Sequence, residues 1–240
     1  MKKGIAFLTV FCLGVTLCAA PPSVASLIAA YGFSEGTGTT TADASGNGNT
    51  GTLVNGVAWA AGGKLSFDGI DDRVNIGTGV GVSTALTLEA WIYIATAPNT
   101  AQVILAKSTN YTLQITSPDV GLWVLRFYNG SSFNDSTYLP LNTWTHVAVT
   151  VDGMVRFYVN GVLSSSAAGA VGATNANVAW IGWYDGGSAV HQWKGSLDDV
   201  RIYNHVLTVA EIVIDMNTPV GSSGSAPNAA TNAAVTFTVQ

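Results

Sequence analysis

The stretch Gly195–Glu211, GSLDDVRIYNHVLTVAE, carries the strongest structural signals in the chain. Its first part, Leu197–Tyr203, sets apolar residues among charged ones, which predicts a strand with one buried face. Thr208 and Glu211 then stand at the T-x-x-E spacing of a capping box, so a short helix is predicted to begin there. We interpret the stretch as the closing strand of a β-sandwich, followed by one short helix near the C-terminus.

The sequence before this stretch predicts an all-β fold. From Leu27 onward, short apolar runs are separated by Gly, Asn, Asp and Ser, and no long amphipathic helical pattern occurs. This spacing favours a two-sheet antiparallel β-sandwich, or jelly roll. The runs predicted to form strands are Leu27–Phe33, Lys64–Asp68, Arg73–Ile76, Leu86–Ile94, Tyr111–Thr116, Gly121–Tyr128, Trp144–Val151 and Val178–Trp183.

Turn residues predict how several strands are paired. Asp152-Gly153 and Asn160-Gly161 are strong two-residue hairpin signals, so three consecutive antiparallel strands are expected between Trp144 and Ser165. Tyr111–Thr116 and Gly121–Tyr128 are expected to form another hairpin. Lys64–Asp68 and Arg73–Ile76 are likewise expected to pair, through the turn at residues 69–72, whose acidic residues Asp68, Asp71 and Asp72 are interpreted as turn residues.

The N-terminus has the layout of a secretory signal peptide. Two lysines precede an apolar run of about a dozen residues, too short to span a membrane, and small residues follow. We therefore expect a signal peptide at 1–25, a folded domain at 26–218 and a linker, or the start of a further segment, at 219–240. The protein is expected to be secreted, extracellular or at the cell surface, with the periplasm as an alternative. Cys12 and Cys18 both lie in the signal peptide, so no disulfide is expected in the mature domain.

Charge narrows the choice of partners. The chain has nine basic and fourteen acidic residues and a net charge of −5. It contains no basic cluster, so nucleic acid is not an expected partner. An acidic surface is compatible with calcium, with neutral glycans or with simple solubility, and it does not decide among them.

Seven segments, taken in order, resemble one family. They are Tyr31–Gly36, Asp43–Asn49, Leu65–Val74, Leu86–Ile92, Asn142–Ala148, Val155–Gly161 and Gly195–Asn204. This series resembles the laminin G-like jelly-roll domains of the concanavalin A-like lectin/glucanase superfamily, in their bacterial secreted form. The resemblance implies two antiparallel sheets packed face to face, in a module that stands beside other extracellular domains. It also implies that a structural Ca²⁺ can lie near the rim of the sandwich.

The expected calcium ligands come from both ends of the domain. Calcium takes six to eight oxygen ligands, and Glu35, Asp43, Asn47 and Asp198 offer carboxylate or amide oxygens. The first and last strands of such a sandwich commonly lie side by side, so these groups could converge on one ion. The alternative is that Asp43 and Asn47 only build turns and that Asp198 faces water.

A sugar-binding site is predicted near the loop that precedes the closing strand. Sugars stack on aromatic rings and form hydrogen bonds with polar groups. The residues that supply this mixture are Trp183, Tyr184, Asp185, His191 and Trp193. The alternative is that Trp183 and Trp193 cover the edge of a sheet, while Trp91, Trp123, Trp144 and Trp180 belong to the core.

Catalysis is not predicted. Glycosidases need two carboxylic acids at a defined separation, and the chain has no closely spaced E-x-D-x-x-E run. G-x-S-x-G, H-E-x-x-H and C-x-x-C motifs are also absent from the sequence. We therefore predict a non-catalytic module that binds a polysaccharide or the glycan of a glycoprotein. The alternative is a structural or adhesive cell-surface domain that contacts other proteins and binds no sugar.

Overall fold

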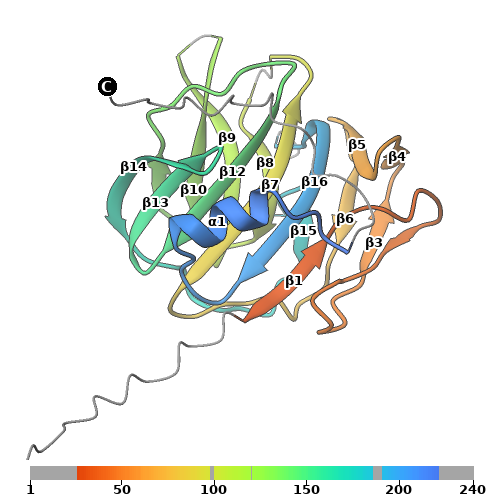
Figure 1. Ribbon diagram of the computed structural model, residues 1–240, viewed down its shortest axis with the longest axis horizontal. Coiled ribbons are helices and arrows are strands. Elements are labelled where there is room, and N and C mark those ends of the chain that lie inside the picture. Colours follow the sequence, from red (N-terminus) through yellow and green to blue (C-terminus); the bar gives the residue numbers. More distant parts are fainter. Residues whose placement is uncertain (1–25, 98–99, 120, 186–190, 222–240) are drawn as a thin grey trace, which may run out of the picture.

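The computed structural model describes residues 26–97, 100–119, 121–185 and 191–221. These residues form two antiparallel sheets packed face to face, with one short helix against one of them (Figure 1). The all-β sandwich predicted from the sequence is therefore confirmed. The predicted signal peptide at 1–25 and nearly all of the predicted linker at 219–240 lie outside the described residues.

The first sheet, here called sheet A, contains the predicted closing strand. Its strands run in the order β14 (Val162–Gly169), β13 (Gly153–Val159), β12 (Trp144–Val151), β7 (Leu86–Ile94), β16 (Lys194–Tyr203), β5 (Lys64–Asp68) and β4 (Ala58–Ala60), and β1 (Leu27–Tyr31) also pairs with β16. The predicted neighbourhood of the first and last strands is thus confirmed. β16 is a central strand, since it bonds β7 on one side and β5 and β1 on the other.

The second sheet, here called sheet B, packs against the inner face of sheet A. Its strands run in the order β11 (Ser132–Asn134), β10 (Leu122–Tyr128), β9 (Tyr111–Asp119), β8 (Gln102–Lys107), β15 (Ala179–Ile181), β6 (Arg73–Asn75), β3 (Gly51–Val54) and β2 (Thr40–Thr41). The hydrophobic core lies between the sheets and takes alternate residues of each strand, such as Leu88, Ala90 and Ile92 of β7.

Most of the predicted pairings hold, and one is wrong. β12, β13 and β14 form the predicted antiparallel series, and β9 pairs with β10 as expected. β5 and β6, which were expected to pair with each other, lie in different sheets: β5 pairs with β16 and β4, whereas β6 pairs with β15 and β3. The acidic turn at residues 69–72 therefore connects the two layers of the sandwich.

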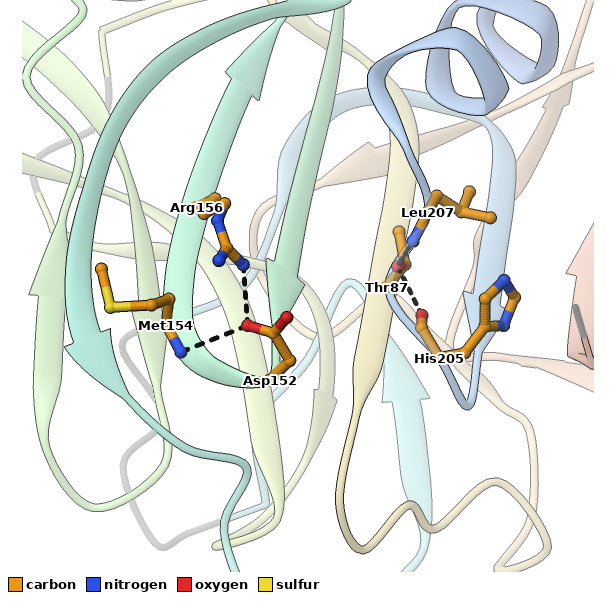
Figure 2. Close-up of polar contacts among 6 residues, drawn as sticks. All are labelled: Thr87, Asp152, Met154, Arg156, His205 and Leu207. Atoms are coloured by element: carbon orange, nitrogen blue, oxygen red, sulfur yellow. Dashed lines mark hydrogen bonds and ion pairs between the residues drawn. The ribbon is translucent and has the colours of Figure 1, made fainter. Parts of the chain in front are cut away.

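The predicted helix is present as α1 (Val209–Met216). Thr208 is its N-cap, and the reciprocal hydrogen bonds with Glu211 complete the capping box. Leading to it, the Thr87 hydroxyl on β7 donates to the backbone oxygen of His205 (2.7 Å) and accepts from the backbone N–H of Leu207 (3.0 Å) (Figure 2). These contacts fasten the connection between β16 and α1 to the outer face of sheet A. No helix in the described part of the chain is long and apolar enough to cross a membrane.

The helix covers polar residues of sheet A. The Trp91 indole N–H donates to the backbone oxygen of Met216 (3.2 Å), and the Tyr203 hydroxyl donates to Asp215 (2.5 Å). Glu89 and His146 lie in the same region and are fully buried. Burial and, secondly, the charge of Asp215 raise the pKa of Glu89 well above its usual range, which favours its protonated form.

Candidate functional site

The outer face of sheet B is polar, and half-buried aromatic rings lie on it and beside it. Because core residues alternate with outward ones along each strand, the neighbours of core residues point to this face. The residues placed there are Arg73 and Asn75 of β6, Trp180 of β15, Thr112 and Gln114 of β9, Arg126 of β10 and Asn134 of β11. We call this set the outer B face.

The aromatic residues of the predicted sugar site adjoin the outer B face. The Arg73 guanidinium lies over the ring of Trp183, at 4.7 Å from its centroid, and over that of Trp180, at 5.4 Å. Tyr184 meets His191 edge to face, with ring centroids 6.4 Å apart. His191 is tied to the sheet, because its backbone oxygen accepts a hydrogen bond from Val103 of β8 (2.9 Å). Tyr184 and His191 are thus in ring contact, and Trp183, the residue before Tyr184, contacts Arg73 of the outer B face.

Three buried polar atoms in this region have no hydrogen-bond partner among the residues that the structure describes. They are Thr112 Oγ1, Trp180 Nε1 and His191 Nδ1. Buried polar groups in folded proteins are nearly always paired, with the protein, water or a ligand. A bound polar molecule is one means of satisfying such groups, and sugar hydroxyls both donate and accept.

Positive charge accompanies these groups. The Arg126 Nε donates to Asn134 Oδ1 (2.7 Å), and Arg126 also lies opposite Gln114 in the β9–β10 pair. Burial lowers the pKa of Arg126 from its usual value, although the side chain remains charged at neutral pH. Burial and then the charge of Arg126 lower the pKa of His191, so its imidazole is neutral at pH 7.

The other two predicted sugar ligands are placed differently. Trp193 is 0% exposed and belongs to the core between the sheets, so its ring cannot stack on a ligand in this structure. Asp185 follows Tyr184, and its charge opposes the lowering of the Lys107 pKa that burial causes. Lys107 itself donates to the backbone oxygens of Thr78 and Asn177, in the segments after β6 and before β15.

Sequence reasoning missed most members of the face, among them Trp180, Gln114, Arg126 and Arg73. Trp180 was assigned to the core, but its neighbours Ala179 and Ile181 occupy the core, and strand alternation directs Trp180 outward. The same alternation could have identified Gln114 and Arg126 once β9 and β10 were recognised as a hairpin. Nothing in the sequence indicated Arg73, because the two tryptophans that it contacts are distant from it along the chain.

Two of the predicted calcium ligands organise a loop. Asp43 Oδ1 accepts hydrogen bonds from the backbone N–H groups of Ala30 (3.0 Å) and Ser45 (2.9 Å), and Oδ2 accepts one from Asn49 (2.9 Å). Burial alone would raise the pKa of Asp43, but a hydrogen bond with the Ser45 side chain and these backbone bonds outweigh it and hold the pKa below its usual value. Asn47 donates through Nδ2 to the backbone oxygens at residues 27 and 28.

The predicted ligands do not gather at one point. Glu35 Oε1 accepts from the backbone N–H of Ala42 (2.6 Å), and Asp198 is buried at 4% exposure and accepts from the backbone N–H of Asp199 (2.8 Å). Among the described residues, the acidic groups whose ligand atoms lie within 4.8 Å of one another are Asp68, Asp71 and Asp72. The carboxylates of Glu35, Asp43 and Asp198 do not form such a group in the described part of the chain, and the Asp198–Asp199 pair is buried, not a solvated strand face.

Comparison with known proteins places this arrangement in a wider group. A family model described as the Concanavalin A-like lectin/glucanases superfamily matches residues 67–213. A search of curated protein sequences returned no match.

Solved structures with the same fold include several binding domains. Domain 4 of an extracellular arabinanase from Geobacillus stearothermophilus, in complex with arabinotriose, has a TM-score of 0.64 at 23% identity, covering 80% of this chain and 98% of that domain. A Trypanosoma rangeli sialidase in complex with sialic acid has a TM-score of 0.60 at 18% identity, and the match covers 78% of this chain and 32% of the sialidase. The binding domain of Paraclostridial Mosquitocidal Protein 1 has a TM-score of 0.58 at 16% identity, and the match covers 80% of this chain and 52% of that one.

Proposed function

Because the chain belongs to the laminin G-like branch of the Concanavalin A-like lectin/glucanases superfamily, we propose that it is a non-catalytic module that binds carbohydrate on the outer B face. The observation that carries the proposal is the combination of aromatic rings and unpartnered polar atoms there. Trp183 and Tyr184 offer rings for stacking on a sugar, while Thr112, Trp180 and His191 offer groups for its hydroxyls.

Two further facts support this proposal. The arabinanase domain with the same fold is described in complex with a trisaccharide, although a likeness at this identity speaks only for the fold. In addition, strands β6, β8, β10, β11 and β15 contain no Asp or Glu, whereas glycoside hydrolysis needs a pair of carboxylic acids. These five strands therefore lack the pair of carboxylic acids that would cleave a sugar, whereas the outer B face has groups suited to binding one.

Trp183→Ala is expected to weaken glycan binding at least about tenfold, which corresponds to about 1.4 kcal/mol. The matched control is Trp144→Ala, because Trp144 is a half-buried tryptophan in sheet A that contacts Tyr93 and Lys64. A glycan array followed by isothermal titration with the selected glycan measures both variants. Equal binding by the wild type and the Trp183 variant would contradict the proposed location.

A protein-binding role is the second candidate. Val162 and Leu163 begin the edge strand β14 and are 69% and 50% exposed, and Ile214 of α1 is 61% exposed. Exposed apolar residues at a free sheet edge are suited to protein contact. A domain that works only in this way is expected to bind no glycan on the array.

Secretion and a structural calcium ion remain part of the proposal. Adding Ca²⁺ to chelated protein is expected to raise the melting temperature. Asp43→Asn and Asp198→Asn would suppress that rise if the sequence-derived ligands are correct, whereas Asp71→Asn would suppress it if the 69–72 turn holds the ion. Calorimetry that detects neither calcium uptake nor a melting shift would exclude the ion.

A further inference from the structure

Two arginines of the outer B face, Arg73 on β6 and Arg126 on β10, lie on one line that runs across the strands of sheet B. The register links Val74 to Ile181, Ile181 to Leu105, Leu105 to Leu113 and Leu113 to Phe127, and these residues belong to the core. The row ends at Val74 and Phe127, and Arg73 and Arg126 are the residues directly before these two. Both arginines therefore point outward from sheet B, on one line across its strands. Four strand spacings of about 4.8 Å separate them by about 19 Å.

Among the described residues, neither arginine forms an ion pair with a carboxylate. Arg73 Nη1 donates to the backbone oxygen of Asp71 (2.9 Å), and Arg126 Nε donates to the amide oxygen of Asn134. Within the described residues, the ion pair closer than 4.0 Å is that of Arg156 and Asp152, at 2.7 Å, on the other sheet (Figure 2). Although the chain has a net charge of −5, this face therefore carries two guanidinium groups that no described carboxylate pairs with.

The remaining groups of Arg126 are suited to an anion. Within the described part of the chain its Nη1 and Nη2 groups have no hydrogen-bond partner, the guanidinium being held through the Nε bond to Asn134, and the side chain is half-buried. Guanidinium groups bind carboxylates through paired, charge-assisted hydrogen bonds, which strengthen as water is excluded. The neutral His191 beside it adds a polar group without adding a competing charge.

We propose that the glycan bound on the outer B face carries carboxylate groups, as uronic or sialic acid residues do, and that Arg126 and Arg73 bind them. This inference rests on the proposed function and specifies its ligand class. A chain crossing the strands would pass Trp183 and Trp180 beside Arg73, then reach Arg126 at the far end. In this arrangement the arginines favour a negatively charged glycan over a neutral one, whereas the aromatic rings can stack on any sugar.

The test compares acidic glycans with matched neutral ones. Polygalacturonate, alginate, hyaluronan and a sialylated oligosaccharide are each paired with a carboxyl-reduced derivative, in which every carboxylate has become an alcohol on the same backbone. The wild type is expected to bind at least one acidic member at least tenfold more tightly than its reduced partner, with an affinity that falls as salt is added.

Variants assign the preference to the arginines. Arg126→Gln is expected to lower affinity for the acidic glycan at least tenfold and to leave affinity for the reduced one nearly unchanged, and Arg73→Gln is expected to act in the same direction. The control is Arg156→Gln, because Arg156 already pairs with Asp152 and lies on sheet A. Circular dichroism and the melting temperature confirm that each variant is folded.

The outcomes separate this inference from the proposed function. Binding that depends on Trp183 but is equal for acidic and reduced glycans would overturn the carboxylate preference and leave the proposed function intact. An acidic preference unchanged in both arginine variants would also overturn the inference. Absence of binding to every acidic and neutral glycan would overturn both.

Discussion

Gly195→Ala is expected to lower the free energy of unfolding by more than about 3 kcal/mol, a large fraction of the roughly 5–15 kcal/mol by which an ordinary protein is stable. Gly195 has φ of 140° and lies in β16, between Ile94 of β7 and Phe67 of β5. A Cβ atom at this position would stand 2.1 Å from the backbone oxygen of Tyr93. Relief of this overlap requires the two central strands of sheet A to separate, which breaks their hydrogen bonds and opens the core.

Gly153→Ala provides the matched control. Gly153 also has a positive φ, 97°, but a Cβ atom there meets nothing within 4 Å. That variant is expected to lose only about 1 kcal/mol, from backbone strain alone. Urea denaturation followed by tryptophan fluorescence measures both changes. Similar, small losses in the two variants would show that the central strands tolerate the overlap and would contradict the close approach of β7 and β16.

Local chemistry predicted the hairpins and the helix but not which sheet each strand joins. The Asp152-Gly153 turn and the Thr208–Glu211 capping box act over a few residues, so the sequence contains everything that specifies them. β5 and β6 look like another hairpin in the sequence because they are adjacent, yet each finds its partners elsewhere along the chain. That choice depends on long-range packing, which adjacent residues do not encode.

The central strand β16 contains a bulge that its apolar spacing could have revealed. Leu197, Val200 and Ile202 all face the core, although the first interval is three residues and the second is two. The register shifts between Asp198 and Arg201, and Asp199 takes a positive φ of 47°, which restores the inward direction of Val200. An interval of three within an alternating strand predicts such a bulge.

The candidate site could be predicted only in part, for physical reasons. Trp183, Tyr184 and His191 lie close in sequence, so a loop rich in aromatic residues indicated them. The calcium prediction relied on acidic residues among glycines, a composition shared by cation sites and by turns in which a carboxylate accepts backbone N–H bonds. Asp43 shows the second arrangement, and the sequence does not distinguish it from the first.

Asp198→Asn is expected to stabilise the protein at pH 8 and to flatten the dependence of its stability on pH. Burial and then the charge of Asp199 raise the pKa of Asp198 from 3.8 to about 8. Between these two values the folded protein holds a proton that the unfolded chain releases, so stability falls as the pH rises. This group contributes a slope of up to about 1.4 kcal/mol per pH unit. Asparagine is neutral at every pH, and its oxygen can still accept the Asp199 N–H bond.

Three other buried groups also change how the stability depends on pH, and the direction of each contribution follows from its pKa shift. The pKa values of Glu89 and Asp199 are also raised by burial, so both add to the loss of stability as the pH rises. His146 has the opposite sign, because burial and the charge of Arg201 lower its pKa from 6.5 to about 3, and stability rises with pH between these values. Above pH 6.5 the acids act without this opposition, so the decline should be clearest between pH 6.5 and 8.

Melting temperatures from pH 5 to pH 9, measured with chelator, test the prediction. Asp152→Asn is the control, because Asp152 is an exposed carboxylate in the Arg156 ion pair and its loss should leave the slope above pH 6.5 unchanged. A parallel pH profile for the wild type and Asp198→Asn would show that Asp198 does not hold the proton. Repeating the series with Ca²⁺ separates the two roles of Asp198, since a calcium ligand would make Asp198→Asn less stable than the wild type when the ion is present, whereas a buried, protonated acid makes the variant more stable in both conditions.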